Sequence, residues 1–377
     1  MSRTGLGTAR AIADRIADRM LSASVLERLA LAVASTILAL LIGAVIVAAS
    51  GYDAVEFVSA LVFGAVGNLS NIAFTLRQST MLILTGVAVA VAFRAGVFNI
   101  GVQGQFVVGG LAGTLAVLVL VPLLPAGVAT GVAIMALAAL AAIIAGGAYA
   151  ALPGMMKAYA GANEVITTIM LNFIAAGVVY FLIDAYLKPP GAAAPNTAAF
   201  PDYVDLPGVA FGSPSFSVIG LGIALLTVLV VYVLMARTSF GYDLVTSGHQ
   251  EPAAKYSGVD PKRMIVRTMT ISGMVAGLAG AMFAIMILGY YSDPNSFPTF
   301  GFDAIAVSLL GANNPLAVVP AGILFGGLDA GGQYIGFTLD VPSELVDGVI
   351  GLIVLFVAVP ELFRMAGRYT GLGGEHQ

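Results

Sequence analysis

The chain has 377 residues, of which 59% are hydrophobic and 10% charged, with a formal net charge of −4 and a mean hydropathy of +0.99. A soluble domain carries about 25% charged residues, so this composition excludes a soluble enzyme, a disordered chain and a nucleic-acid binder. The chain has no Cys and only two His, which excludes a disulfide and a cysteine nucleophile and disfavours a metal site. We also expect no cofactor and no catalytic residue, because no nucleophile–base pair is found in the sequence.

Uncharged stretches predict membrane-spanning helices along the chain, because a helix needs about 20 apolar residues to cross a bilayer. Residues 1–28 come first and predict a basic amphipathic helix on the inner surface. A break at Asn313-Asn314-Pro315 divides the run 304–328 into a short helix and a longer one. Counted in this way there are ten segments, in the runs 29–52, 78–93, 95–156 (two), 165–183, 206–236, 268–292, 304–328 (two) and 345–363.

Lys and Arg residues predict the orientation, since they favour cytoplasmic loops. With the N-terminus and the tail 364–377 in the cytoplasm, only Arg77 and Lys188 fall outside. Residues 53–76 are moderately apolar, and we place them outside as an interfacial or re-entrant helix. If they formed an eleventh span, every later loop would change sides and the charge bias would be lost.

The chain is therefore predicted to be an all-α polytopic membrane protein with two five-helix halves, 29–187 and 216–363, joined by an outer loop at 188–215. The first half starts inside and the second outside, so their topologies are inverted, as is common in transporters. In this arrangement the segment 53–76 corresponds to the inner loop 237–267.

The inner loop 237–267 is long for a transporter turn. Pro252 suits the first turn of a helix and Gly258 its end, which predicts a short helix over 251–257 on the cytoplasmic face. This helix either sits in a groove of a soluble partner or is incidental to a solvated loop. The residues that would make the contact are Glu251, Pro252, Ala253, Ala254, Lys255 and Gly258.

The loop and the glycine-rich stretch 270–280 that follows it resemble the membrane subunits of ATP-binding-cassette (ABC) importers. The similar group is the permease family for ribose, galactose, nucleosides and branched-chain amino acids, nearest its nucleoside branch. Three further stretches carry the resemblance, namely AFRAGVFNIGVQGQ at 92–105, GANEVITTIMLN at 161–172 and SLLGANNP at 308–315. The family usually has a basic residue where this chain has Thr246, so a salt bridge from that position is not expected.

The resemblance implies a multi-pass protein of the cell membrane that binds no nucleotide itself. Two permeases, identical or different, would form the pore, and two cytoplasmic ATPases would bind the coupling helices. An extracytoplasmic binding protein would deliver the ligand. The expected activity is import of a nucleoside. Import of a simple sugar or a branched-chain amino acid is the alternative, and a stand-alone secondary transporter or channel is the alternative of another class.

Polar residues at membrane depth are the candidates for the substrate path. Glycines at 96, 101 and 104 favour a broken helix, which is tolerated only against protein or water. The side chains there either recognise a sugar or a base ring, or hold helices together. The expected path residues are Phe98, Asn99, Gln103, Asn172, Asp303 and Asn313, whereas Gln105 is expected to join helices.

Acidic residues near membrane depth are functional candidates by default. Glu164 begins a span, where a carboxylate either stabilises the helix N-terminus or acts in a gate. Asp303 and Asp329 have no Lys, Arg or His that the sequence identifies as an intramembrane partner, which disfavours proton or ion coupling.

Overall fold

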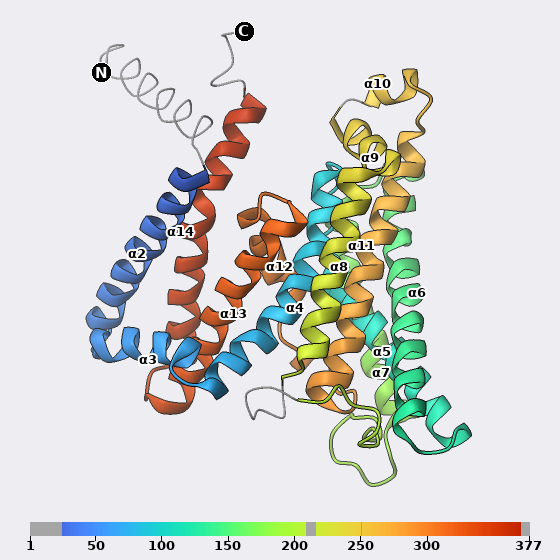
Figure 1. Ribbon diagram of the computed structural model, residues 1–377, viewed down its shortest axis with the longest axis horizontal. Helices are drawn as coiled ribbons and strands as arrows, with labels where there is room; N and C mark the ends of the chain where they lie inside the picture. Colours follow the sequence, from blue (N-terminus) through green and yellow to red (C-terminus); the bar gives the residue numbers. More distant parts are fainter. Residues whose placement is uncertain (1–24, 209–215, 250, 371–377) are drawn as a thin grey trace. The chain divides into compact units, whose positions relative to one another are not determined.

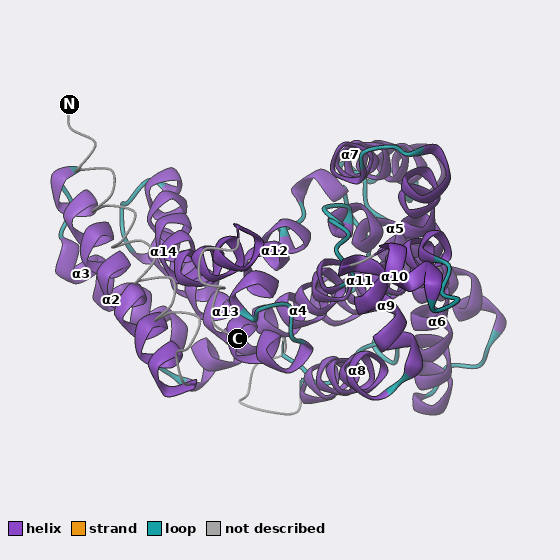
Figure 2. Cartoon of the chain, turned by 90° about the horizontal axis from the view of Figure 1, so that it is seen from above, coloured by secondary structure: helices purple, strands orange, loops and turns teal. Residues whose placement is uncertain are grey.

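The computed structural model describes residues 25–208, 216–249 and 251–370, and every regular element in these ranges is a helix (Figures 1 and 2). Seven of the described helices are long and apolar enough to cross a membrane. They are Leu69–Arg94, Val102–Leu123, Val128–Ala160, Glu164–Leu187, Val218–Arg237, Pro261–Leu288 and Pro315–Thr338. The all-helical membrane class is thus confirmed. The amphipathic helix expected before residue 25 lies outside the described residues.

The chain divides into two compact units, and the smaller contains residues up to Gly64 and from Gly331 onward. Here α2 (Val25–Ala49) packs on α14 (Ser343–Thr370). Close packing also joins α3 (Ala54–Val66) to the last residues of α13 (Pro315–Thr338), where the rings of Phe63 and Tyr334 lie 5.4 Å apart. Asp53 directly precedes α3, and its Oδ1 accepts the N–H of Val55 at 2.8 Å and of Glu56 at 3.0 Å.

The segment 53–76 is not one helix, which corrects the expected boundary. Asn68 caps a new helix, α4 (Leu69–Arg94), by accepting the N–H of Asn71 at 2.8 Å. The span predicted from residue 78 therefore begins nine residues earlier. The polar residues that interrupt the apolar run are accommodated by protein partners; the Thr75 hydroxyl, for example, donates to the Ala65 carbonyl at 2.7 Å.

The larger unit, residues 65–330, is built around α4 and α11 (Pro261–Phe283), which are mostly buried. Helix α11 packs on α4, on α5 (Val102–Leu120) and on α6 (Val128–Ala160). Glycine allows the close approach, since a Cβ at Gly277 would lie 2.2 Å from the Ala142 carbonyl oxygen and one at Gly280 would lie 2.0 Å from that of Phe106. The glycines of α11 at positions 273, 277 and 280 therefore form a packing surface, and their helical spacing is typical of such a surface.

The remaining helices of this unit surround that core. Helix α7 (Glu164–Leu182) packs on α5, while α8 (Val218–Arg237) and α12 (Phe300–Leu310) pack on α4. A short π-helical turn follows α7 (Ile183–Leu187) and another follows α11 (Ala284–Leu288). Each long helix is apolar on most of its surface and needs either protein or lipid around it.

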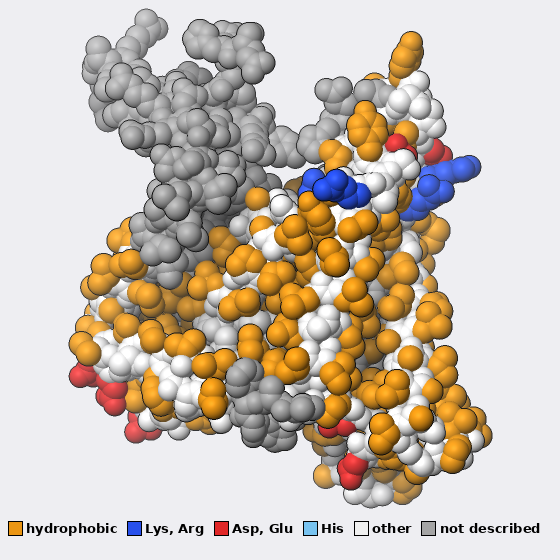
Figure 3. All heavy atoms as spheres, in the orientation of Figure 1, with side chains coloured by type: hydrophobic (Ala, Val, Ile, Leu, Met, Phe, Trp, Pro, Cys, Tyr) orange, Lys and Arg blue, Asp and Glu red, His pale blue; other side chains and the backbone are white. Residues whose placement is uncertain are grey.

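One end of the larger unit carries the inner loop of the sequence analysis. It contains two helices, α9 (Ser239–His249) and α10 (Glu251–Tyr256), beside the end of α8 and the start of α11 (Figure 1). Helix α10 agrees with the helix predicted over 251–257, whereas α9 was not expected. We call this the α10 end. Residues 188–208 lie at the opposite end (Figure 1), and on the face shown in Figure 3 the visible Lys and Arg side chains gather near the α10 end.

Candidate functional site

Two helices of the larger unit begin against each other. Helix α5 follows the non-helical stretch 95–101, and α12 follows the loop 289–299. Gln103 in the first turn of α5 joins them, because its Oε1 accepts the N–H of Gly301 at 2.8 Å and its Nε2 donates to the carbonyl of Pro298 at 3.1 Å. We call this meeting point of the two helix starts the helix-start junction.

The junction lies well inside the bundle. Asn172 of α7 holds the start of α5, as its Oδ1 accepts the N–H of Gly104 at 2.8 Å and its Nδ2 donates to the carbonyl of Ile100 at 2.9 Å. Asn172 is eight residues into α7, a depth of about 12 Å at 1.5 Å per residue. Non-helical backbone is thus present at membrane depth, where it must lie against protein or water.

Asn99 joins three helices instead of facing an opening. Its side chain is fully buried, and its Nδ2 donates to Ser272 Oγ at 2.8 Å and to Gln105 Oε1 at 2.9 Å. Its Oδ1 accepts from Gln105 Nε2 at 3.0 Å and from the Gly101 N–H at 3.1 Å. Ser272 of α11 in turn donates to the Ala88 carbonyl of α4 at 2.6 Å. Both polar atoms of Asn99 are therefore used within the protein, as the sequence predicts for Gln105.

Asp303 is the acidic group nearest the junction, two residues after Gly301. It is exposed in the single chain, and its Oδ2 accepts the Thr299 hydroxyl at 3.1 Å. The side chain of Phe302 next to it is 39% exposed. A carboxylate in this position has oxygen atoms available to a ligand with N–H or O–H donors.

Asp329 has polar partners that the sequence analysis did not identify. Its carboxylate accepts a hydrogen bond from Gln78 of α4 and interacts electrostatically with Arg77. The guanidinium of Arg77 lies 4.1 Å from the centre of the Phe74 ring. The expectation that Asp329 lacks a basic partner is therefore wrong. Arg77 was assigned to an outer loop, but the earlier start of α4 places it on the helix that packs beside α13.

Three other predicted groups have local partners of their own. Phe98 is 52% exposed and its ring packs edge-on against Phe93, with 5.1 Å between centroids. Asn313 lies in the turn between α12 and α13, with a left-handed φ of 56°, and accepts the Ser308 hydroxyl at 2.9 Å. Glu164 pairs with Lys157, a pairing that the sequence analysis did not predict.

The α10 end contacts the non-helical stretch that leads to α5. A Cβ at Gly248 of α9 would lie 2.3 Å from the Ala95 carbonyl oxygen, so the two backbones touch. In α10, Ala254 is buried whereas Tyr256 is 97% exposed. Gly258 ends the helix with a φ of +84°, as predicted. Pro252 and Lys255 are exposed, while the side chains of Glu251 and Ala253 lie outside the described residues.

Sequence reasoning missed both the Gly248 contact and Tyr256. The inner loop has aromatic residues at Phe240, Tyr242 and Tyr256. A tyrosine in such a polar loop is the signal that would have identified Tyr256, because exposed tyrosines are common in interfaces. Across the part of the chain that the structure describes, no group of three or more His, Cys, Asp or Glu side chains could hold a metal ion.

Comparison with known proteins gives one family and several relatives. The model of the family described as the permease component of branched-chain amino acid transport systems matches residues 71–358. The guanosine ABC transporter permease protein NupP of Bacillus subtilis is 38% identical, over 88% of this chain and 94% of its own length.

Two further relatives cover a similar part of the chain. The glucose ABC transporter permease protein TsgB13 of Haloferax volcanii is 30% identical, over 88% of this chain and 87% of its own length. The nucleoside ABC transporter permease protein NupB of Lactococcus lactis is 29% identical, over 85% of this chain and 87% of its own length. No solved structure matches the chain significantly.

Proposed function

This chain belongs to the family of permease components of branched-chain amino acid transport systems, and from that membership we propose that it is the membrane subunit of an ABC importer for a nucleoside. A relative named for guanosine, at 38% identity, and one named for nucleosides support the substrate class. The relative named for glucose makes import of a simple sugar the second candidate.

The proposed topology has ten membrane segments in two inverted halves, with both termini in the cytoplasm. Helices α2 and α14 would add two spans to the seven long apolar helices, and α12, which has only 11 residues, would enter the membrane without crossing it. Arg94, Lys157, Arg237 and Lys262 lie at helix ends that meet at the α10 end, which supports a cytoplasmic position for it. The loop at residues 188–208 then faces outside.

The observation that carries the transport proposal is an exposed carboxylate beside two broken helices. An ionised Asp at membrane depth is costly in contact with lipid, so Asp303 must face water or protein. Discontinuous helices that meet within the bundle are typical of substrate sites in transporters. We place the path along Asp303, Phe302 and Gln103, while Asn99 and Asn172 hold the walls.

A second permease would complete the path. In the single chain Asp303 is exposed, and so are large apolar side chains of α7, including Phe173 at 68% and Phe181 at 57%. A partner permease on this side, identical or different, would enclose Asp303 and keep it from lipid. An extracytoplasmic binding protein would load the path from the side of residues 188–208.

A separate ATPase would act through α10. Tyr256 is exposed on this short helix, and α9 before it touches the stretch that leads to α5. Movement of α10 by an ATPase would thus reach the helix-start junction through Gly248 and Ala95. Pro252 and Lys255, exposed on the same helix, would add to the contact.

The substrate is tested by competition. Vesicles that contain the permease, its ATPase and its binding protein should accumulate labelled guanosine, and an excess of unlabelled uridine or guanosine should reduce the accumulation more than glucose or leucine does. If glucose competes best, the sugar candidate replaces the nucleoside. If leucine competes best, neither candidate holds.

A further inference from the structure

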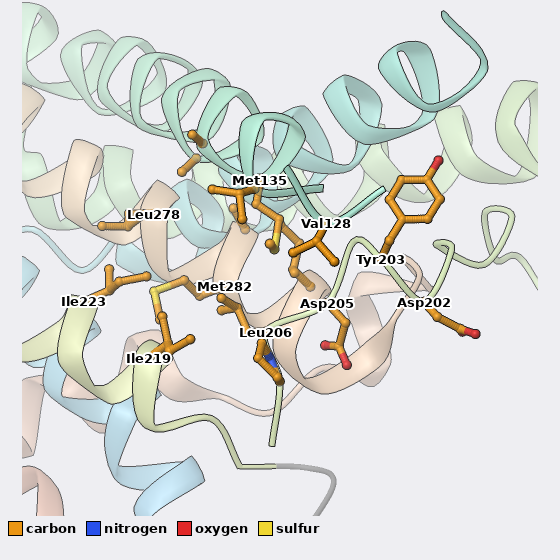
Figure 4. A pocket seen from close by; sticks show the side chains of 16 residues that line it. Val128, Met135, Asp202, Tyr203, Asp205, Leu206, Ile219, Ile223, Leu278 and Met282 are labelled. Atoms are coloured by element: carbon orange, nitrogen blue, oxygen red, sulfur yellow. The ribbon is translucent and has the colours of Figure 1, made fainter. Parts of the chain in front are cut away.

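A cavity of about 570 Å³ is lined by residues near the starts of α6 and α8, so it lies at the end of the larger unit opposite α10 (Figure 1). Its walls come from α6, α8 and α11, and residues 202–207 border it. Figure 4 shows Met135, Ile223 and Met282 pointing into it from these three helices. The lining is almost entirely apolar, so the cavity lacks the polar groups that would hold a nucleoside.

The cavity lies on the outer surface of helices that belong in lipid. Val132 of α6 and Ile219 of α8 both line it, and they are 58% and 50% exposed. Around a membrane-spanning helix such apolar side chains face acyl chains. A hydrocarbon chain can therefore enter from the side without crossing a polar surface.

The border of the cavity is fixed in place. Val204 is 1% exposed and belongs to a buried cluster with Ile134 and Ile285. At Gly131 of α6 the backbone of Tyr203 lies so close that a Cβ would meet its carbonyl oxygen. The loop thus keeps a defined position beside the cavity. The same contacts fix the backbone of Asp202 and Asp205, the two acids that flank Tyr203 and Val204.

Two carboxylates, those of Asp202 and Asp205, lie at this border. Asp202 and Asp205 are both exposed, and neither takes part in an ion pair that the described residues form. Partial burial raises the pKa of Asp205 and the charge of Asp202 adds to this rise, although a hydrogen bond from the Leu206 backbone N–H lowers the pKa. A cation at this position would relieve both effects, whereas an anionic group would be repelled.

We propose that the cavity is a lipid site, which takes an acyl chain of a phospholipid with an ammonium headgroup and places that ammonium between Asp202 and Asp205. Phosphatidylethanolamine has this chemistry, because its headgroup offers three N–H donors on a positive charge. The site does not depend on which solute the protein transports.

Lipid retention tests the proposal. The full chain is placed in nanodiscs with equal amounts of phosphatidylethanolamine and phosphatidylglycerol, released into detergent, and the bound lipids are counted by native mass spectrometry. We expect phosphatidylethanolamine to be enriched. The double variant Asp202→Asn/Asp205→Asn should lower this enrichment about tenfold, because it removes charge-assisted hydrogen bonds.

Two further variants separate the site from general effects. Ala136→Phe fills the cavity and should reduce retention of both lipids. Asp293→Asn changes an acid of another loop that does not line the cavity, and it should bind lipid as the wild type does. Equal retention of the two lipids by the wild type would overturn the proposal, as would unchanged enrichment in the double variant.

Discussion

At the scale of single residues, the amides near the broken helix differ in what their hydrogen bonds connect. Asn99 is fully buried and bonded on both polar atoms to protein groups. Gln103 is hydrogen-bonded to backbone groups at the start of a second helix, α12. One of these groups, the N–H of Gly301, lies two residues before the exposed Asp303. These hydrogen bonds support a structural role for Asn99, whereas the proposed path of the transported solute runs beside Gln103 and Asp303.

The pair Asn99 and Gln105 should contribute to stability as a unit. Asn99→Ala or Gln105→Ala alone is expected to cost about 1 to 2 kcal/mol of unfolding free energy, since each leaves a buried amide without its partner. The double variant should cost clearly less than the sum of the two. Reversible unfolding in mixed micelles measures this, and strictly additive costs would show that the two amides do not act together.

Asp303 should affect transport and not folding. Asp303→Asn keeps the size of the side chain but removes the charge, so uptake is expected to fall at least about tenfold while the amount of membrane-inserted protein is unchanged. Asp340→Asn serves as the control, because Asp340 is also exposed but lies outside the larger unit. Wild-type uptake by Asp303→Asn would remove Asp303 from the path.

At the scale of helices, packing depends on glycines, which can be recognised in the sequence because they are three or four residues apart. The helical spacing of Gly273, Gly277 and Gly280 is typical of a close helix contact, and α11 makes that contact with α5 and α6. The start of α4 was harder to predict. Its first turns include the polar residues Asn71, Arg77 and Gln78. Arg77 and Gln78 interact with Asp329, a residue far away in the sequence, so hydropathy alone placed the start of the span too late.

Gly277 gives a matched test of this packing. Gly277→Ala should destabilise the protein by at least about 2 kcal/mol, because the new methyl group would overlap the Ala142 carbonyl. Gly177→Ala on α7 is the control, since nothing lies within 4 Å of a Cβ there. Thermal unfolding of both variants in the same detergent measures the difference. Equal melting temperatures for Gly277→Ala and Gly177→Ala would contradict the close packing at Gly277.

Helix α10 should bind the ATPase mainly through Tyr256. Tyr256→Ala is expected to weaken binding of the ATPase about tenfold and to lower uptake with it, because an exposed tyrosine at an interface often dominates the binding energy. Tyr186→Ala removes a tyrosine that is 73% exposed at the opposite end and should have no effect on the ATPase. Co-purification of the ATPase with each variant provides the measurement. Unchanged binding by Tyr256→Ala would leave α10 without the proposed contact.

At the scale of the whole molecule, composition was enough to predict an all-helical membrane protein, and motifs were enough to predict the family. The short helix at 251–257 followed from Pro252 and Gly258. What could not be predicted were contacts between distant residues, such as Gln103 with Gly301, Gly248 with Ala95 and Arg77 with Asp329. A single sequence contains periodicity and local signals, but it does not show which helix starts meet.

The proposed topology can be tested directly because the natural chain has no Cys. A single cysteine introduced as Tyr256→Cys should react with a membrane-impermeant maleimide only after the cells are opened, whereas Ala193→Cys should react in intact cells. Both positions are exposed, so access to the reagent decides the result. Labelling of Tyr256→Cys in intact cells would reverse the orientation.

The central claim, that a separate ATPase drives this permease, is tested most directly by measuring what energises uptake. Labelled guanosine should accumulate against its gradient in vesicles that contain this permease, the ATPase, the binding protein and enclosed ATP, and accumulation should stop when the ATPase is left out. Concentrative uptake by the permease alone would contradict a subunit that is driven by a separate motor.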